Sequence, residues 1–255
     1  MKSILKWSIR IIRTILIFFI LSFSLESFVE QSIRITRIHN FTKQGVYQKD
    51  ISTEDIKYYK VDKNIDKPGY TIANDGEMLP GYPGDILVTP LTYLDNDVLE
   101  RLMSFFVGGH AGICLGNYED YDVEIYDDSS LETSGVRHGI DSCQAFDKSV
   151  WNNENAYDTV IGLRPKKMTD EIRDEILSLA MSHYGDPYNY NFTFDTKNKS
   201  YCSDLLSKVY KEIGINLNYD GFWTTVHDLI VSKDLIITYY HYYDKNGVMK
   251  VYYAE

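Results

Sequence analysis

The first 25 residues differ in kind from the rest of the chain, because clustered positive charge is followed there by an unbroken apolar run. The positive charge lies on four side chains: Lys2, Lys6, Arg10 and Arg13. No acidic residue precedes Glu26. The apolar run covers residues 14–25, or begins at Ile11 on a wider definition, which suits the core of a signal peptide and is short for a membrane-spanning helix.

No A-x-A cleavage site follows the apolar run, and "SFS" at 22–24 is a weak substitute. Cleavage and retention as an anchor therefore both stay open, with the N-terminus on the inner side of the membrane and the bulk of the chain on the outer side. An amphipathic or core helix is the alternative interpretation. We predict a signal peptide or membrane anchor over 1–25, a polar stalk or N-terminal extension rich in turn formers over 26–79, and one domain over 80–255. The predicted location is exported, either anchored in the membrane or in the cell envelope or extracellular space.

Charge and cysteine content exclude several classes of protein. The formal net charge is −11 and the isoelectric point is about 5.0, so the surface repels phosphate backbones and we expect no nucleic-acid partner. The three cysteines include no C-x-x-C pair. Neither a structural zinc site nor a disulfide framework is supported, and we predict no metal and no cofactor.

The predicted domain alternates short strands with helices. Strands are expected over 84–89 and 110–117, with two more around a turn between 118 and 139. Helices are expected over 94–106 and 168–185, the second capped by Thr169. The last residues predict two strands around an Asn-Gly turn. This mixture predicts an α+β domain with a central antiparallel sheet packed against helices.

The stretch "YCSDLLSKVYKEIG" places Cys202 at or near the first turn of a helix. The apolar face of this helix lies within 205–213, and Gly214 stands where a terminating glycine belongs. Unpaired N–H groups and the helix dipole lower the pKa of a thiol at that position, and an N–H there can stabilise an oxyanion. Cys202 is therefore suited to be a nucleophile if a base lies near, while an inert buried cysteine is the alternative.

His110 is the strongest candidate for that base, because it opens a predicted strand directly after paired glycines. On this strand, Gly112 shares the face of His110 and is expected to leave it open, as a cleft would. The other histidines occupy less informative positions: His39, His138, His183, His227 and His241.

A third residue should orient the imidazole ring. Glu132 lies on a predicted neighbouring strand, and Glu124 and Asp122 are rivals. The sequence spacing does not choose among the three.

Five segments occur in an order typical of one family: "GDILVT", "GGHAGICLGN", "LETSGV", "HYGDPYNYNF" and "YCSDLLSKVYKEIGINL". Over about residues 80 to 240 the chain resembles the YiiX/YebB-like, NlpC-type cysteine hydrolases. The resemblance implies a circularly permuted papain-like fold, in which the histidine strand precedes the cysteine helix.

The resemblance also implies roles for individual residues. It implies Cys202 as nucleophile, His110 as general base and Glu132 as the group that orients the histidine. It implies that Tyr188, in "GDPYNY", and Tyr201, just before the nucleophile, line the substrate site. The segment between His110 and Glu132 is longer than in the family pattern, so Glu124 and Asp122 remain candidates for the residue that orients the histidine.

These observations predict an extracytoplasmic cysteine hydrolase that acts through an acyl-enzyme on an amide or peptide bond, such as that of a cell-wall peptide. Two alternatives belong to other classes: a thiol-dependent lipid acyl hydrolase or acyltransferase, and a non-catalytic envelope binding module. The expected partners are a peptide, a peptidoglycan-like or acyl substrate, and a membrane through the N-terminal segment.

Overall fold

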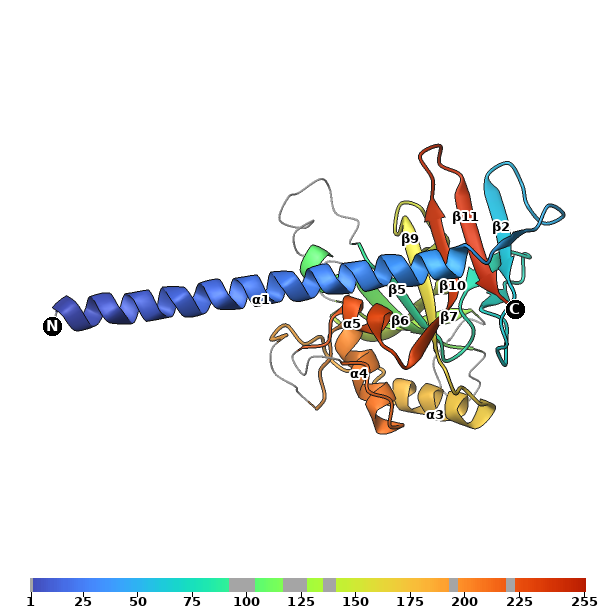
Figure 1. The fold of residues 1–255 in the computed structure, drawn as a ribbon. Helices are drawn as coiled ribbons and strands as arrows, with labels where there is room; N and C mark the ends of the chain where they lie inside the picture. Colours follow the sequence, from blue (N-terminus) through green and yellow to red (C-terminus); the bar gives the residue numbers. More distant parts are fainter. Residues whose placement is uncertain (1, 92–103, 117–127, 135–140, 193–196, 219–222) are drawn as a thin grey trace.

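The computed structural model describes residues 2–91, 104–116, 128–134, 141–192, 197–218 and 223–255 (Figure 1). The helices are α1 (Lys2–Thr42), η2 (Lys148–Asn152, a 3-10 helix), α3 (Asp170–Met181), α4 (Cys202–Glu212) and α5 (Val226–Val231). The strands are β1 (Val46–Tyr47), β2 (Ile56–Val61), β3 (Tyr70–Ile72), β4 (Met78–Pro80), β5 (Ile86–Thr89), β6 (His110–Cys114), β7 (Ser129–Ser134), β8 (Ser142–Asp147), β9 (Thr159–Pro165), β10 (Leu235–Tyr243) and β11 (Met249–Ala254).

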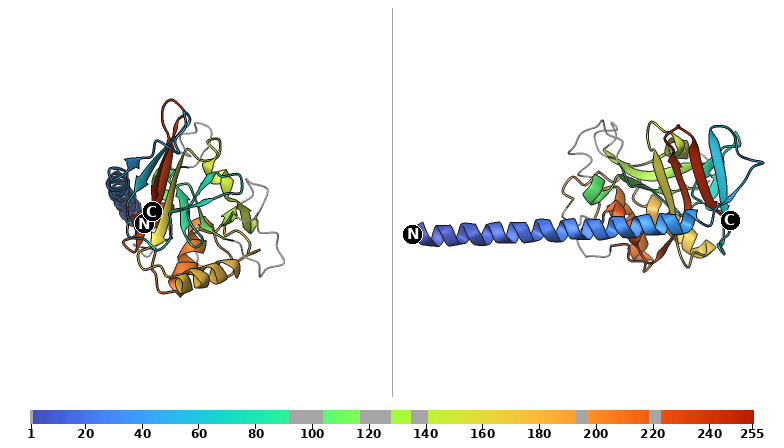
Figure 2. Two further views of the ribbon diagram at one scale, coloured as in Figure 1. Left: turned by 90° about the vertical axis from the view of Figure 1, so that its right-hand side faces the viewer. Right: turned by 45° about the horizontal axis from the view of Figure 1, so that its top comes forward.

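Within the described residues, the strands form a nine-stranded sheet in the order β1-β2-β11-β10-β9-β5-β6-β7-β8, and β3 pairs with β4 separately (Figure 2). Every pairing in the large sheet is antiparallel except that of β11 with β2. The predicted α+β class is confirmed, with one parallel pair added. The hairpin of β10 and β11 turns at Gly247, whose φ of 75° suits a residue without a Cβ.

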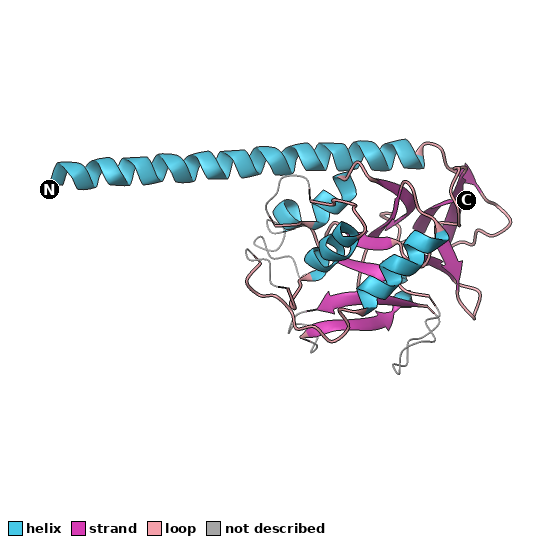
Figure 3. Ribbon diagram, turned by 90° about the horizontal axis from the view of Figure 1, so that it is seen from below, coloured by secondary structure: helices cyan, strands magenta, loops and turns pink. Residues whose placement is uncertain are grey.

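Helices α3, α4 and α5 cover one face of the sheet (Figure 3). The predicted cap of α3 is present, because the Thr169 hydroxyl accepts a hydrogen bond from the N–H of Ile172. On α4 the predicted apolar face is buried in the core, together with Ile113 of β6 and Leu163 of β9. The core between helices and sheet therefore fixes where α4 begins relative to β6.

Helix α1 is 41 residues long and extends far beyond the body of the molecule (Figure 1). It continues to Thr42, well past the predicted boundary at residue 25. Within 6–42 it contains an 18-residue window with a mean hydropathy of 1.9, no part of which is buried. The helix is long and apolar enough to cross a membrane, which is compatible with a signal anchor.

Residues 26–79 differ from the stalk that the sequence predicts. The second half of α1 packs against α5 and β10, and β2 joins the large sheet beside β11. The inward face of α1 mixes polar and apolar residues: Ser27 and Phe41 are each only 2% exposed, and Arg37 is half-buried. The sequence of this half of the helix therefore lacks the regular apolar spacing that predicts a packed helix. The sequence therefore looks like a polar extension although the segment completes the fold.

A buried ion pair joins this N-terminal region to the sheet. The Arg164 guanidinium on β9 donates to both carboxylate oxygens of Asp85, over 2.7 and 2.8 Å. It also donates to Asp66 over 3.1 Å and to the carbonyl of Pro68 over 2.7 Å. Both Arg164 and Asp85 are almost fully buried, so each charge depends on the other for its stability.

Asp85→Ala should lower the free energy of unfolding by about 3–5 kcal/mol, because it leaves the buried Arg164 charge without its two-pronged partner. The melting temperature should fall by about 6–20 °C. Lys60→Ala, which breaks an exposed pair with Glu255, should leave the melting temperature almost unchanged. Equal melting curves for Asp85→Ala and the unmodified protein would contradict this account.

Candidate active site

Paired glycines bring the backbone to the start of β6, where His110 lies. Gly108 has a φ of 81°, and a Cβ there would stand 2.6 Å from the Cβ of Val226 on α5. A Cβ on Gly109 would stand 2.5 Å from the carbonyl oxygen of Leu91. Only glycines allow such close contacts, so the "GG" before His110 sets the position of the ring.

Glu132 of β7 lies beside His110 of β6. The two strands pair with Gly112 opposite Glu132, and the Nε2 atom of His110 lies 2.7 Å from Oε2 of Glu132. A Cβ on Gly112 would stand 2.8 Å from Cγ of Glu132 and 3.4 Å from the Trp151 ring. The expectation that Gly112 leaves the histidine face open is therefore wrong, because the glutamate and tryptophan side chains fill that space.

The second oxygen of Glu132 is held by two residues that the sequence analysis did not single out. Ser130 donates its hydroxyl to Oε1 over 2.5 Å, and the Trp151 indole N–H donates to the same oxygen over 2.9 Å. Ser130 precedes Glu132 by two residues and shares its face of the strand, so the period of a strand could have suggested it. Trp151 lies on η2, and nothing in the sequence connects it to β7.

Aromatic rings pack around the imidazole. The Trp151 ring is nearly parallel to that of His110, with centroids 5.8 Å apart, and the Tyr157 ring stacks on Trp151 at 4.6 Å. Burial raises the pKa of Tyr157 to about 12, so its phenol is neutral. These rings limit the rotation of His110 and leave it 18% exposed.

Cys202 begins α4, and its side chain lies close enough to the His110 ring for each group to shift the pKa of the other. The Nε2 atom of that ring is the one that faces Glu132. Burial acts to raise the pKa of Cys202, but the hydrogen bond and charge of His110, with the backbone N–H groups of Ser203 and Ala111, lower it below the ordinary value. The structure thus brings together the three predicted residues Cys202, His110 and Glu132.

The pKa of His110 lies well above its ordinary value. Burial acts to lower it, while the hydrogen bonds with Cys202 and Glu132 and the charge of Glu132 raise it. A raised pKa of histidine and a lowered pKa of cysteine in direct contact favour a thiolate–imidazolium pair.

The two predicted substrate-binding tyrosines both lie near Cys202 but differ in burial. Tyr188 is half-buried, and burial followed by the neighbouring Cys202 raises its pKa. Its segment is fixed between β8 and the start of α4, where Tyr188 bridges to Ser200. Tyr201 is the N-cap residue of α4, is 7% exposed and stacks near Phe192. Tyr188 therefore offers more surface to a substrate than Tyr201 does.

Of the other candidates, three are not described by the structure and two are buried cysteines. Glu124, Asp122 and His138 lie outside the described residues. Burial raises the pKa of Cys114 and of Cys143 to about 12, which keeps both thiols protonated.

The remaining histidines serve elsewhere. His227 on α5 is hydrogen-bonded to the carbonyl of Ser104, His241 is buried in β10, His183 pairs with Asp186, and His39 lies on α1.

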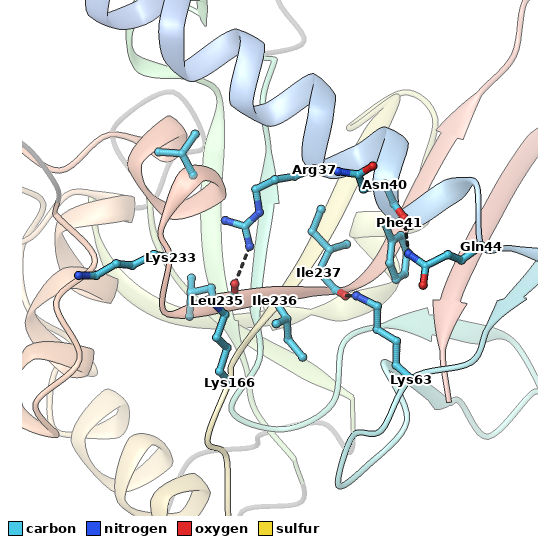
Figure 4. Close-up of a pocket in the computed structure, with 11 residues that line it drawn as sticks. Arg37, Asn40, Phe41, Gln44, Lys63, Lys166, Lys233, Leu235, Ile236 and Ile237 are labelled. Carbon is cyan, nitrogen blue, oxygen red and sulfur yellow. Dashed lines mark hydrogen bonds between the residues drawn. The ribbon is translucent and has the colours of Figure 1, made fainter.

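A cavity of about 340 Å³ lies between the end of α1 and β10 (Figure 4). Its lining includes Arg37, Lys63, Lys166 and Lys233. Arg37 points to the carbonyl of Leu235, and none of the three predicted catalytic residues reaches this cavity. Across the residues that the structure describes, no cluster of three or more His, Cys, Asp or Glu could hold a metal ion.

Residues 83–223 match the profile of a family described as permuted papain-like amidase enzymes, YaeF/YiiX, C92. The match covers more than half of the chain and includes the histidine, glutamate and cysteine just described. The chain belongs to this family. Its fold is therefore permuted papain-like, and at the level of the family it is a cysteine hydrolase of the amidase type, which confirms the resemblance seen in the sequence.

A solved structure is also similar to this chain: the crystal structure of metalloprotein yiiX from Escherichia coli O157:H7. The two sequences are 12% identical, the match covers 61% of this chain and 95% of that chain, and the TM-score is 0.46. A search of curated proteins gives no match.

The rate at which iodoacetamide alkylates Cys202 should report the thiolate–imidazolium pair directly. Because His110 lowers the pKa of Cys202, alkylation should reach half of its plateau at a lower pH than for an ordinary thiol. His110→Ala removes that hydrogen bond and charge, so the profile should move to higher pH. Glu132→Gln removes a charge that raises the pKa of His110. In this variant, His110 should therefore lose its proton at a lower pH, and the thiolate–imidazolium pair should exist over a narrower pH range.

The matched control is His39→Ala, which removes an exposed histidine on α1 and should leave the profile unchanged. An unchanged profile in His110→Ala would show that the two side chains are not coupled.

Proposed function

We propose that this amidase-family protein is an extracytoplasmic cysteine hydrolase that cleaves an amide or peptide bond through an acyl-enzyme, with Cys202 as nucleophile, His110 as general base and Glu132 as the residue that orients the ring. The observation that carries the proposal is the 2.7 Å contact between His110 and Glu132, together with the proximity of His110 to Cys202 that lowers the pKa of the thiol. Such a nucleophile–base–orienter arrangement is what covalent hydrolysis requires.

In the acylation step, the thiolate of Cys202 attacks the substrate carbonyl carbon and the carbonyl electron pair moves to oxygen. The imidazolium of His110 then gives its proton to the leaving nitrogen as the C–N bond breaks, which leaves a thioester on Cys202 and a free amine. Glu132 stabilises the positive ring before the transfer and keeps it directed at the sulfur.

In the deacylation step, neutral His110 accepts a proton from water while the water oxygen attacks the thioester carbonyl. Collapse of the tetrahedral intermediate releases a carboxylic acid and restores the thiolate–imidazolium pair. The N-cap residue of α4, Tyr201, contributes no side-chain hydrogen bond to the helix start. The proposed oxyanion donors are therefore backbone N–H groups of that first turn, beginning with Cys202, and the half-buried Tyr188 is proposed to line the site beside them.

The proposed substrate is a cell-wall peptide or a similar amide. A second candidate activity, thiol-dependent hydrolysis or transfer of a lipid acyl group, uses the same intermediates, because amides and esters both pass through a thioester at Cys202. This candidate is favoured by the link between the site and α1: Ser203 donates to the carbonyl of Thr224, and the adjacent Trp223 meets Phe23 of α1 edge-on. A panel of muropeptides and phospholipids separates the two activities.

Cys202→Ser should lower turnover by more than about 10³-fold, because a serine hydroxyl has no comparable anionic form at neutral pH. Cys114→Ser is the matched control: its thiol is buried and donates to the carbonyl of Pro80, so turnover should be largely retained. Activity of the full-length protein in detergent should be measured on the same panel, since part of α1 belongs to the fold. Substantial turnover by Cys202→Ser would rule out this mechanism.

The location proposed for the domain is outside the cytoplasm, with α1 as its anchor. It is supported by the basic residues that precede the apolar part of α1 and by the absence of acidic residues before Glu26. Protease added to intact spheroplasts should therefore digest the domain. Complete protection until the cells are lysed would show that the N-terminal segment does not export it.

A further inference from the structure

An aromatic cluster marks the place where α1 leaves the body. Phe23 of α1 stacks on Phe106 with ring centroids 5.0 Å apart, and Trp223 meets Phe23 edge-on at 6.3 Å. Phe105 packs edge-on against Phe106 at 5.1 Å. We call these four residues the aromatic collar. Three of them belong to the domain and one to α1, so the collar joins the two.

The collar is not a buried core. Phe105 is 38% and Trp223 is 36% exposed, which is unusual for large apolar side chains of one cluster. On the neighbouring turn of α1, Leu25 and Phe28 are 65% and 64% exposed, whereas Ser27 faces inward at 2%. Exposed apolar side chains are therefore present at this level both on α1 and on the domain.

The position of the collar along α1 matches one face of a bilayer. Trp7 is exposed among the basic residues that precede the apolar run, and it precedes Phe23 by a helical rise of about 24 Å, with Arg10 and Arg13 between it and residue 14. That length is close to the roughly 30 Å of a hydrocarbon core, and tryptophans and tyrosines concentrate at both of its interfaces. Trp7 and the collar thus occupy the two levels at which aromatic belts are found.

No flexible connection separates the collar from the domain. The Arg37 guanidinium of α1 donates to the carbonyls of Ile230 and Ser232, each over 2.6 Å. Gln31 is hydrogen-bonded to His227 of α5 over 3.0 Å. Because α1 continues through both contacts as one helix, its depth in the membrane also fixes the depth of the domain.

We propose that the aromatic collar lies in the headgroup layer of the membrane that α1 enters, and that the domain is docked directly against the bilayer with Cys202 beside its surface. This inference rests on the proposed function of α1 as an anchor. The hydroxyl of Ser203, next to the nucleophile, donates to the carbonyl of Thr224 over 2.8 Å, and Thr224 follows Trp223 in the chain. The substrate class that fits is an amide or acyl group on a molecule held at the membrane surface.

Fluorescence of the full-length protein in phosphatidylglycerol–phosphatidylethanolamine vesicles tests this arrangement. Some vesicles carry a lipid with a spin label near the glycerol backbone, others one at the end of the acyl chain. Trp7→Phe retains Trp223 and Trp151, and Trp7→Phe/Trp223→Phe retains only the buried Trp151, so their difference gives the signal of Trp223. That signal should be quenched more by the label near the glycerol backbone. Trp223→Phe reports on Trp7 in the same way.

The outcomes separate the docking from the anchor. Quenching of Trp7 without quenching of Trp223 would leave the anchor standing and overturn the docking. Quenching of neither would overturn both. An unquenched Trp223 signal that depends on protein concentration would show that a second copy covers the collar, which also overturns the proposal.

Alkylation of Cys202 gives an independent measurement. A lipid that carries iodoacetamide on its headgroup should label Cys202, and Phe105→Ser/Trp223→Ser should slow that labelling several-fold while water-soluble iodoacetamide reacts at an unchanged rate. The unchanged soluble reaction shows that the variant is folded with its thiolate intact. Equal slowing of both reagents, or of neither, would contradict the docking.

Discussion

The candidate site depends on the contact between His110 and Glu132, which is built into the sheet. Strands β6 and β7 pair so that Gly112 faces Glu132, and the missing Cβ of the glycine is the space through which the glutamate reaches the ring. Ser130 and Trp151 both donate to one carboxylate oxygen of Glu132, which leaves the other oxygen to contact His110. The register of β6 and β7 therefore fixes the Glu132 charge that raises the pKa of His110. The protonated His110 in turn lowers the pKa of Cys202.

Much of this could be predicted from local patterns. The position of α4 follows from the helical spacing of its apolar residues, and the turn before His110 follows from the paired glycines. The role of Trp151 could not be predicted from the sequence, because its indole meets Glu132 only once η2 and β7 are brought together in the folded chain. The role of Gly112 was misjudged for a related reason: a strand's period shows which face a residue shares, but not which side chain of the next strand fills the space.

The N-terminal region shows a different limit of the sequence. Pattern analysis looks for apolar periods, yet the inner face of α1 is held by Arg37, whose guanidinium donates to backbone carbonyls, and by small or aromatic residues. β2 is short and pairs with β11, almost 200 residues away in the chain. Such long-range contacts carry no local signal, so a structural segment resembles a linker. This difference matters for the proposed anchoring. A helix that is part of the domain fixes the distance between the domain and the membrane, whereas a flexible stalk would not.

The parallel pairing of β2 with β11 also sets an order of events. Residues 56–61 leave the ribosome early, but their partner strand is made only when residues 249–254 are added. Until then β2 presents an open edge, and non-local pairings of this kind form slowly. A chain whose first helix is already held at the membrane would thus have to keep its early strands from pairing wrongly until its last strand arrives. Completion of the fold is in this sense coupled to completion of synthesis.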